Sequence, residues 1–485
     1  MCKLFNLRKF SIQTLCKLFN LRILSFDHCE ELRRLPKQIH KLQNLQILKL
    51  AYCTKLKKLP GSLTKLVNLQ ELDVQGCHWL KELPEDLSNL KNLAKLNIAE
   101  CASLTRMPPK IGELTRLQKL SRYIAVYDDN HGKSICAIPE LQTLINLQQL
   151  HVQNLERVSN FAEDVQAAKA IQENTRLEHL ALEWEWWDMD SVAEAASIQI
   201  IAECFEPNSN LRMLEMVCYM EKELPGWMKE EGVSSHLNFL VEIRLVNLKR
   251  CERLPPLGQL PYLENVEISG MDSIKVVDDA FCGQTYHIFR SLKKITFSEM
   301  LTLEEWHVER QRYPKAFPKL GELTLIQCPR FRGFDKRIVY NGIKTRMWLN
   351  NETLLTSELE HSHNYMCITE LEIVGCQELR CLPQTMKYYL NYVKTLKIVG
   401  CNQLVALPDW LQDLKYLRKL TILCCPALRY IPERFLKENE FQLSVMKGSR
   451  RLRHATMGDG FQLRMIEDEL RMRMRMRMRM RMRML

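Results

Sequence analysis

A repeat of 24 residues dominates the first part of the chain. Its copies place a leucine at the same position of successive units, at residues 21, 45, 69, 93 and 117. In the second copy Leu48 and Leu50 alternate with Lys49, so this segment is predicted to be a short β-strand with one buried face. One unit cannot bury that face alone, and neighbouring units must therefore stack so that their apolar residues form a continuous core.

Each strand segment belongs to the same motif, L-x-x-L-x-L-x-x-C, in which Phe, Val or Ile can replace the third leucine. The first copy runs from Leu21 to Cys29, and the next three end at Cys53, Cys77 and Cys101. A period of 20–29 residues with this motif is the signature of leucine-rich repeats. We therefore predict an α/β fold, a leucine-rich-repeat solenoid in the form of a curved horseshoe. A parallel β-sheet lines its concave face, and helices and irregular coils form its convex face.

The cysteines indicate buried thiols. The chain holds 18 cysteines, and those at the last position of the motif are Cys29, Cys53, Cys77, Cys101, Cys328, Cys376, Cys401 and Cys425. Because such side chains point into the core in parallel, we predict that they bond neighbouring backbone groups and form neither disulfides nor metal sites.

The sequence also predicts where the chain resides. The N-terminus lacks the apolar segment of a signal peptide, and no apolar run is long enough to span a bilayer. We expect a reducing location in the cytoplasm, with the nucleus and the membrane periphery as alternatives. The glycosylation sequon at Asn351 is then silent.

The repeat is regular near both ends of the chain and irregular between them. The irregular units are longer, and Ser191-x-x-Glu194 predicts the start of a helix that Pro207 stops. The expected segments are an incomplete or degenerate N-terminal coil (1–20), regular repeats (21–120), longer repeats with convex helices (121–334), an insertion or break (335–366), regular repeats (367–435) and a polar tail (436–485).

The tail ends in a run in which Arg and Met alternate from Arg471 onward. Its seven arginines account for most of the formal net charge of +11. We predict that this low-complexity run is disordered or a translated nucleotide repeat, with an amphipathic strand and a polyanion-binding segment as alternatives.

No motif predicts catalysis or a cofactor. The chain has no phosphate-binding loop, no dinucleotide fingerprint, no nucleophile elbow and no zinc-protease motif. His361 and His363 lie in the irregular segment and are predicted to be solvated. We expect neither an enzyme nor a bound metal or cofactor.

The candidate binding surface is the concave face. Residues beside the framework leucines point outward there and differ from unit to unit, which suits a tunable protein-binding surface. An ordinary solvated face is the alternative. Trp184 is an interface anchor or packs on an adjacent helix. The candidates are Arg22, Lys49, Tyr52, Glu71, Asp73, Lys95, Glu100, Glu183, Trp184, Lys397 and Arg418.

A basic column is the second candidate surface. It comprises Arg33, Arg34, Lys57, Lys58, Lys81 and Arg106, which recur at one position of the first units. Stacking should align these residues along one flank. They form either a solvated edge or a docking surface for an acidic protein. Nucleic acid is not expected, because no aromatic residues are interleaved and glutamates such as Glu82 dilute the positive charge.

Several further motifs carry a family resemblance. They are Leu254-Pro255-Pro256-Leu257-Gly258-Gln259-Leu260, Ile268-Ser269-Gly270-Met271-Asp272, Leu303-Glu304-Glu305-Trp306 and Pro225-x-Trp227-Met228. With them, residues 21–435 resemble the repeat region of plant intracellular nucleotide-binding leucine-rich-repeat immune receptors of the coiled-coil class. The resemblance implies that the chain recognises pathogen effectors, directly or through a guarded host protein. It also implies that the first coils dock on a nucleotide-binding domain.

The coiled-coil and nucleotide-binding domains of that family do not occur in this sequence, so no nucleotide site is expected. The chain is then a fragment, a truncated receptor acting as a decoy or adaptor, or a gene remnant. A non-immune intracellular scaffold is the rival class, although it would keep uniform short repeats throughout. A secreted or membrane receptor would carry a signal peptide and Asn in place of the repeated Cys. The sequence predicts no oligomeric state.

Overall fold

The computed structural model describes most of the repeat region. The described residues are 19–128, 133–136, 138–158, 171–185, 192–285, 287–307, 316–331, 333–334, 345–349, 368–384, 386–432, 435 and 442–445. The chain divides into two compact units, Met1–Leu263 and Glu264–Leu485. Each unit is described by itself.

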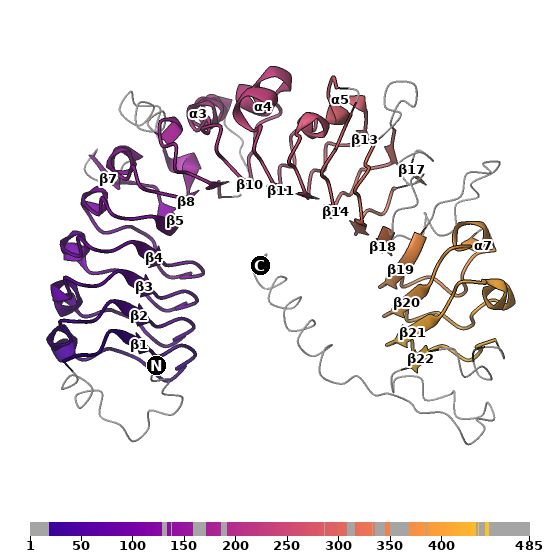
Figure 1. Cartoon of the computed structure of the whole chain (residues 1–485), viewed down its shortest axis with the longest axis horizontal. Helices are drawn as coiled ribbons and strands as arrows, with labels where there is room; N and C mark the ends of the chain where they lie inside the picture. Colours follow the sequence, from indigo (N-terminus) through magenta and orange to yellow (C-terminus); the bar gives the residue numbers. More distant parts are fainter. Residues whose placement is uncertain are drawn as a thin grey trace. The chain divides into compact units, whose positions relative to one another are not determined.

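A parallel β-sheet runs through the first unit (Figure 1). Its strands, in spatial and sequence order, are β1 (Ile23–Ser25), β2 (Ile47–Lys49), β3 (Glu71–Asp73), β4 (Lys95–Asn97), β5 (Lys119–Ile124), β8 (Gln149–Gln153), β9 (His179–Glu183), β10 (Met213–Val217) and β11 (Glu242–Val246). Each repeat thus supplies one strand, as the 24-residue period predicts.

The leucines of the motif form the core of this sheet. In the strand register Leu24 lies beside Leu48, and Leu48 lies beside Leu72. Leu48 and Leu72 are fully buried, whereas the strand residues on either side of each are only half-buried. Burying a leucine side chain stabilises a fold by roughly 1.5–3 kcal/mol, so a row of such contacts holds each coil to its neighbours.

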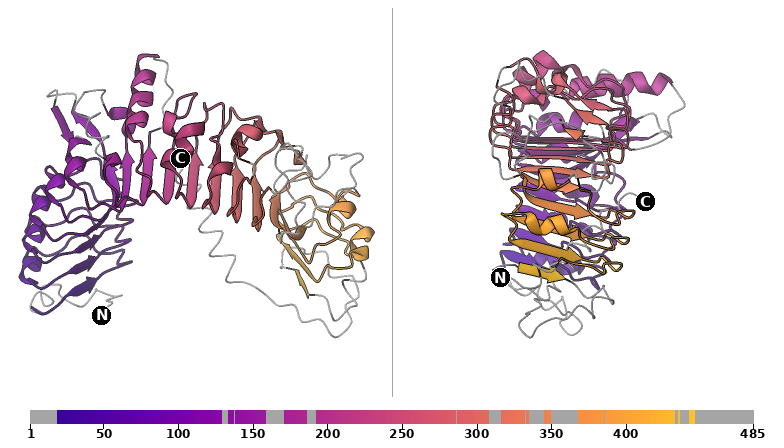
Figure 2. Two further views of the ribbon diagram at one scale, coloured as in Figure 1. Left: turned by 45° about the horizontal axis from the view of Figure 1, so that its top comes forward. Right: turned by 90° about the vertical axis from the view of Figure 1, so that its right-hand side faces the viewer.

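Short helical turns cover one face of the sheet and leave the other open (Figure 2). We call the uncovered face the open face. Pro36, Pro60 and Pro84 are the N-cap residues of the first three turns, and their backbone is not yet helical. The 3₁₀ turns of this unit are η1 (Lys37–Lys41), η2 (Gly61–Lys65), η3 (Glu85–Asn89), η4 (Ile111–Glu113), η5 (Ile138–Thr143), η6 (Leu155–Arg157), η7 (Gly226–Met228) and η8 (Leu257–Gln259).

Longer helices appear in the irregular repeats, as the sequence predicts. They are α3 (Val192–Cys204) and α4 (Glu230–His236). Trp227 is buried and donates its indole N–H to the Ala202 carbonyl, 3.0 Å away, which ties η7 to α3. The predicted capping residue Ser191 lies outside the described residues. An antiparallel hairpin of β6 (Val126–Asp128) and β7 (Lys133–Cys136) was not predicted.

The second unit repeats the arrangement with its own parallel strands. They are β12 (Asn265–Ser269), β14 (Lys294–Ser298), β16 (Glu322–Ile326), β18 (Thr345–Leu349), β19 (Ile368–Val374), β20 (Thr395–Val399), β21 (Lys419–Leu423) and β22 (Gln442–Val445). Its helices and turns are α5 (Asp279–Cys282), α7 (Met386–Tyr389) and η9 (Asp409–Asp413).

A smaller parallel sheet lies within the second unit. It comprises β13 (Val276–Val277), β15 (Glu305–Trp306) and β17 (Gly333–Phe334). Trp306 is buried there, and the rings of Phe297 and Phe317 contact it edge-on with centroids 5.4 and 5.6 Å away. Aromatic pairs in this geometry add about 0.5–1.5 kcal/mol beyond their buried area.

Two strands lie where the sequence did not predict them. The segment 335–366, expected to be an insertion or break, contains β18, which pairs with β16 and β19. Met347 lies opposite Leu323 and Leu349 opposite Leu325, so these residues take the framework positions. The expected polar tail contains β22, where Leu443 pairs with Leu420.

Candidate protein-binding face

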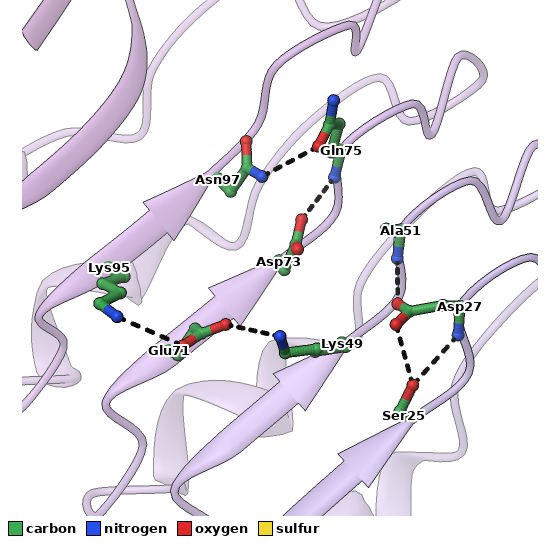
Figure 3. Close-up of polar contacts among 9 residues, drawn as sticks. All are labelled: Ser25, Asp27, Lys49, Ala51, Glu71, Asp73, Gln75, Lys95 and Asn97. Carbon is green, nitrogen blue, oxygen red and sulfur yellow. Dashed lines mark hydrogen bonds and ion pairs between the residues drawn. The ribbon is translucent and has the colours of Figure 1, made fainter. Parts of the chain in front are cut away.

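The first four coils build an ordered row of side chains on the open face. Two rows run across β1 to β4: Ile23, Ile47, Glu71 and Lys95 form one, and Ser25, Lys49, Asp73 and Asn97 form the other. Figure 3 shows the polar side chains of these rows on neighbouring strands. The alternation around each buried leucine therefore brings the predicted residues Lys49, Glu71, Asp73 and Lys95 onto one surface.

A carboxylate shared by two lysines connects three strands. The ammonium of Lys49 lies 3.2 Å from Glu71 Oε1, and the ammonium of Lys95 lies 3.9 Å from Glu71 Oε2 (Figure 3). The hydrogen bond to Glu71 raises the pKa of Lys49, so this side chain stays charged. Surface ion pairs of this kind contribute little to stability, roughly 0–1 kcal/mol. They fix where the charges of the face lie.

Two aspartates on this face have different surroundings. Asp27 accepts hydrogen bonds from the Ser25 hydroxyl (3.0 Å) and the Ala51 backbone N–H (2.9 Å). Asp73 accepts one from the Gln75 N–H (3.1 Å), and burial raises the pKa of its carboxyl. Among the described residues no cation forms an ion pair with Asp73.

A row of residues with left-handed backbone follows the strands. His28, Tyr52, Gly76 and Glu100 all have φ near +60°, between +59° and +68°. The rings of His28 and Tyr52 stack with centroids 4.9 Å apart. A Cβ added to Gly76 would lie 2.4 Å from the Tyr52 ring, so the ring lies directly over the glycine backbone. The sequence places Tyr52 and Glu100 on the surface but does not reveal this stack.

Side-chain amides form hydrogen bonds that connect this row to β4. The Gln75 Nε2 group donates to the Tyr52 hydroxyl (3.2 Å) and to Glu100 Oε1 (3.1 Å). The Asn97 Nδ2 group donates to Gln75 Oε1 (3.3 Å; Figure 3). Gln75, held by Asn97, thus orients the predicted residues Tyr52 and Glu100. In the sequence, only their positions in the repeat motif indicated Gln75 and Asn97.

Farther along the sheet, Glu183 belongs to a polar network that crosses three strands. It accepts a hydrogen bond from Gln153, and its Oε2 lies 2.8 Å from His151 Nε2. Burial raises the pKa of Glu183, but His151, Gln153 and Arg122 outweigh this effect, so the pKa falls below its ordinary value. Arg122 donates to Gln153 and to the Cys101 carbonyl.

The prediction that Trp184 anchors a partner is wrong. Its side chain is 1% exposed, and its ring meets Tyr219 edge-on with centroids 5.0 Å apart. Tyr219 in turn hydrogen-bonds Gln199 of α3. Trp184 therefore packs toward the helical side, which was the alternative interpretation. Its neighbours Trp186 and Trp187 lie outside the described residues.

The remaining predicted residues are exposed or half-buried. Arg22 is exposed at the start of the sheet. Lys397 and Arg418 belong to the second unit, where Lys397 pairs with Glu372 at 2.7 Å and Arg418 donates to the Lys415 carbonyl at 3.0 Å.

The basic column aligns along one flank of the first unit. Lys57 donates its backbone N–H to Arg33, and Lys81 donates to Lys57. Isolated parallel β-bridges of the backbone join Arg34 to Lys58 and Lys58 to Glu82. Two contacts reduce the free positive charge, because Lys58 pairs with Glu82 at 2.6 Å and the Lys57 ammonium lies 5.5 Å from the Trp79 ring centroid.

The remaining cations of the column keep their charge available. Arg33, Arg34 and Lys81 are exposed and form no ion pair with any other described residue. Arg106 is also exposed, and its charge helps to lower the pKa of Glu82, an effect due mainly to Lys58.

Seven of the eight repeated cysteines are buried, and Cys29 is half-buried. The thiols of Cys53, Cys77 and Cys101 each donate to a carbonyl of the preceding coil at 3.2 Å. Burial raises the pKa of Cys53 to about 12 and that of Cys101 to about 11, so these groups stay protonated donors. Within the described ranges, no group of three or more His, Cys, Asp or Glu side chains is arranged to hold a metal ion. Likewise, no helix of the described part is long and apolar enough to cross a membrane.

The fold and the repeated surface define a leucine-rich-repeat protein. Residues 51–341, more than half of the chain, match the family described as leucine-rich repeat region, and the chain belongs to that family. A solved leucine-rich-repeat protein of Leptospira interrogans is 18% identical, with a TM-score of 0.42, and the match covers 91% of this chain and 99% of that one.

The relatives by sequence are plant disease resistance proteins, which confirms the family resemblance found in the sequence. The chain is 32% identical over 259 residues to the disease resistance protein RGA1 of Solanum bulbocastanum, covering 53% of this chain and 24% of RGA1. It is 29% identical over 325 residues to the disease resistance RPP13-like protein 1 of Arabidopsis thaliana, covering 64% of this chain and 30% of that protein. The chain thus spans about a quarter to a third of these relatives.

Proposed function

We propose that this chain is a protein-recognition module in plant defence, which senses a pathogen effector directly or through a guarded host protein. One observation carries the proposal: on β1 to β4 the outward residues change from coil to coil while the buried leucines do not. Ion pairs and amide hydrogen bonds hold these residues in place, which lowers the entropy lost when a partner binds.

Proximity labelling in plant tissue tests this proposal. The full chain, fused to a labelling enzyme, is expressed with and without pathogen challenge. A variant with Lys49, Glu71, Asp73 and Lys95 changed to alanine should lose the labelled partner. A control variant with alanine at Lys37, Lys41 and Lys65, which lie on η1 and η2, should keep it. Equal labelling by both variants would refute recognition through the open face. A partner unrelated to defence would favour the non-immune scaffold.

The basic column supports a second role, docking on a nucleotide-binding domain. Its exposed arginines and lysines match an acidic protein surface, and attraction between exposed charges weakens as salt screens it. This contact would place the repeats where ligand binding can influence a nucleotide-dependent switch.

Co-precipitation with a separately supplied nucleotide-binding fragment of a related receptor tests the docking role. Changing Arg33, Arg34, Lys57 and Lys58 to glutamate should abolish salt-sensitive capture. The same change at Lys37, Lys41 and Lys65 should leave capture intact. Because exposed charges contribute roughly 0.5 kcal/mol or less to stability, the melting temperature should hardly change. A large fall in melting temperature would count against a docking role and favour a structural one.

A further inference from the structure

A polar hollow lies beside the open face, at the start of the strands. Its volume is about 310 Å³, it is open to solvent, and its lining residues are Gln70, Asn92, Ala94, Arg116, Gln118 and Asn146. All six belong to the first unit. Sites for small molecules are lined mostly by apolar and aromatic side chains, and this lining is made of amides, one methyl group and one guanidinium. The hollow therefore suits a polar side chain from a docked protein better than a metabolite.

The hollow lies where a row of glutamines is interrupted. In the second to sixth repeats, the residue after the first leucine is Gln46, Gln70, Ala94, Gln118 and Gln148, respectively. Backbone hydrogen bonds of 2.7–2.8 Å join each residue of this row to the one before it. The row is thus continuous in the backbone, but Ala94 lacks the side chain that its neighbours carry.

Arg116 gives the hollow its charge. It stands in a row where Asn44, Asn68, Asn92 and Asn146 each donate to a carbonyl of the preceding coil at 2.8–3.0 Å. Arg116 instead donates from Nη1 to Asn92 Oδ1 at 2.6 Å. Asn92 is itself fixed by the Val67 carbonyl, so it positions the guanidinium. The other N–H donors of Arg116 form no hydrogen bond with a described residue.

The surroundings favour an anion. Arg116 is the only charged residue of the lining. Lys119, the next residue after Gln118, forms no ion pair with the described part of the chain and lies beside Lys95 in the strand register. The carboxamides of Gln70 and Gln118 are exposed and form no side-chain hydrogen bond with a described residue, so both can donate to a carboxylate.

We propose that the hollow over Ala94 receives an Asp or Glu side chain from an exposed segment of the protein partner. The guanidinium of Arg116 binds the carboxylate in a charge-assisted contact, and Gln70 and Gln118 flank it. This inference rests on the proposed recognition of a protein and adds where one acidic residue of that protein binds.

A library of random 12-residue peptides displayed on phage, selected against the full chain, tests this inference. The recovered peptides should share an Asp or Glu. One such peptide is then synthesised, and its Kd is measured by calorimetry. Arg116→Gln should raise the Kd at least about tenfold, and so should Ala94→Gln, which refills the hollow with the residue of the neighbouring coils. Changing the acidic residue of the peptide to its amide should have the same effect.

Arg176→Gln is the matched control. Arg176 also donates to an asparagine, Asn146, but it does not line the hollow. This variant should bind the peptide within about twofold of the unaltered chain. Recovered peptides without a shared acidic residue would overturn the inference, as would undiminished binding by both Arg116→Gln and Ala94→Gln. Equal losses in Arg176→Gln and Arg116→Gln would show general charge attraction and would also overturn it.

The labelling experiment on the open face separates this inference from the proposed function. If Ala94→Gln and Arg116→Gln still label the plant partner while the open-face variant does not, binding of an acidic side chain in the hollow is refuted. Protein recognition by the open face then stands. If the open-face variant also labels the partner, the proposed recognition through the open face is refuted independently of the hollow.

Discussion

At Gly76, one of the left-handed residues that follow the strands, the neighbouring coil approaches the backbone closely. Gly76 has φ +68°, and an added Cβ would lie 2.4 Å from the Tyr52 ring. We expect Gly76→Ala to lower the free energy of unfolding by about 2–4 kcal/mol, because left-handed strain and the displacement of the ring add together. Urea denaturation of the full chain measures this change.

Gly400 is a control for the strain alone. It also has φ +68°, but an added Cβ would meet nothing closer than 3.9 Å. Gly400→Ala should therefore lower the free energy of unfolding by only about 1 kcal/mol. In a Tyr52→Ala background, the loss of unfolding free energy caused by Gly76→Ala should fall to this same value. Equal losses for the two glycines in the unaltered chain would show that the Tyr52 ring yields without cost.

The raised pKa of Asp73 predicts a stability change that depends on pH. Because burial raises this pKa, the ionised carboxylate costs stability at pH values above it. Asp73→Asn keeps the acceptor for the Gln75 N–H and should add about 0.5 kcal/mol at pH 7, since the half-exposed group is partly screened. The gain should shrink as pH falls from the raised pKa toward 3.8. A loss of stability at pH 7 would contradict this account.

At the scale of the repeat element, the buried thiols act as hydrogen-bond donors between coils. Cys77→Ala removes the bond to the Leu50 carbonyl and leaves a small cavity, so it should cost about 1–2 kcal/mol. Cys77→Ser keeps a donor and should cost less. The exposed Cys381 serves as the control, because its change to alanine should stay within about 0.5 kcal/mol. Chemical denaturation of the three variants measures these differences.

The elements show which parts of the fold the sequence could predict. Strands β1 to β4 and the inward thiols follow from the 24-residue period, because buried positions tolerate few residue types. Strand β18 was missed because its framework positions hold Met347 and Leu349 without the usual leading leucine. Strand β18 is defined by its pairing with the strands on both sides. A short window of sequence carries no information about that pairing. The burial of Trp184 was unpredictable for a similar reason, since it depends on Tyr219 and α3.

The candidate surfaces were predictable only in outline. The motif correctly placed Lys49, Glu71 and Lys95 on one face, because the alternation along a strand is fixed. It did not predict that Glu71 is shared by both lysines, or that Ala94 opens a hollow beside Arg116. Such features depend on side chains from coils 24 residues apart, whose directions only the stacked structure defines.

At the scale of the whole molecule, the repeat makes a strong prediction about deletions. Removing residues 69–92 deletes one full period and joins Asn68 to Leu93, so β2 should pair with β4 and place Leu48 beside Leu96. The shortened chain should fold, because each repeat contacts mainly its neighbours. Removing residues 69–91 leaves one residue too many, and a shift of one residue turns apolar side chains outward. That chain should aggregate or melt at a much lower temperature.

Circular dichroism and melting curves distinguish the two deletions, and partner labelling adds a functional measurement. Removing residues 69–92 also removes Glu71 and Asp73 from the open face, and Gln70 and Asn92 from the hollow. This chain should therefore fold and yet lose its partner. A folded chain that keeps the partner would move recognition away from the first four coils. Equal melting of the two deletions would show that the 24-residue register does not determine how the coils stack.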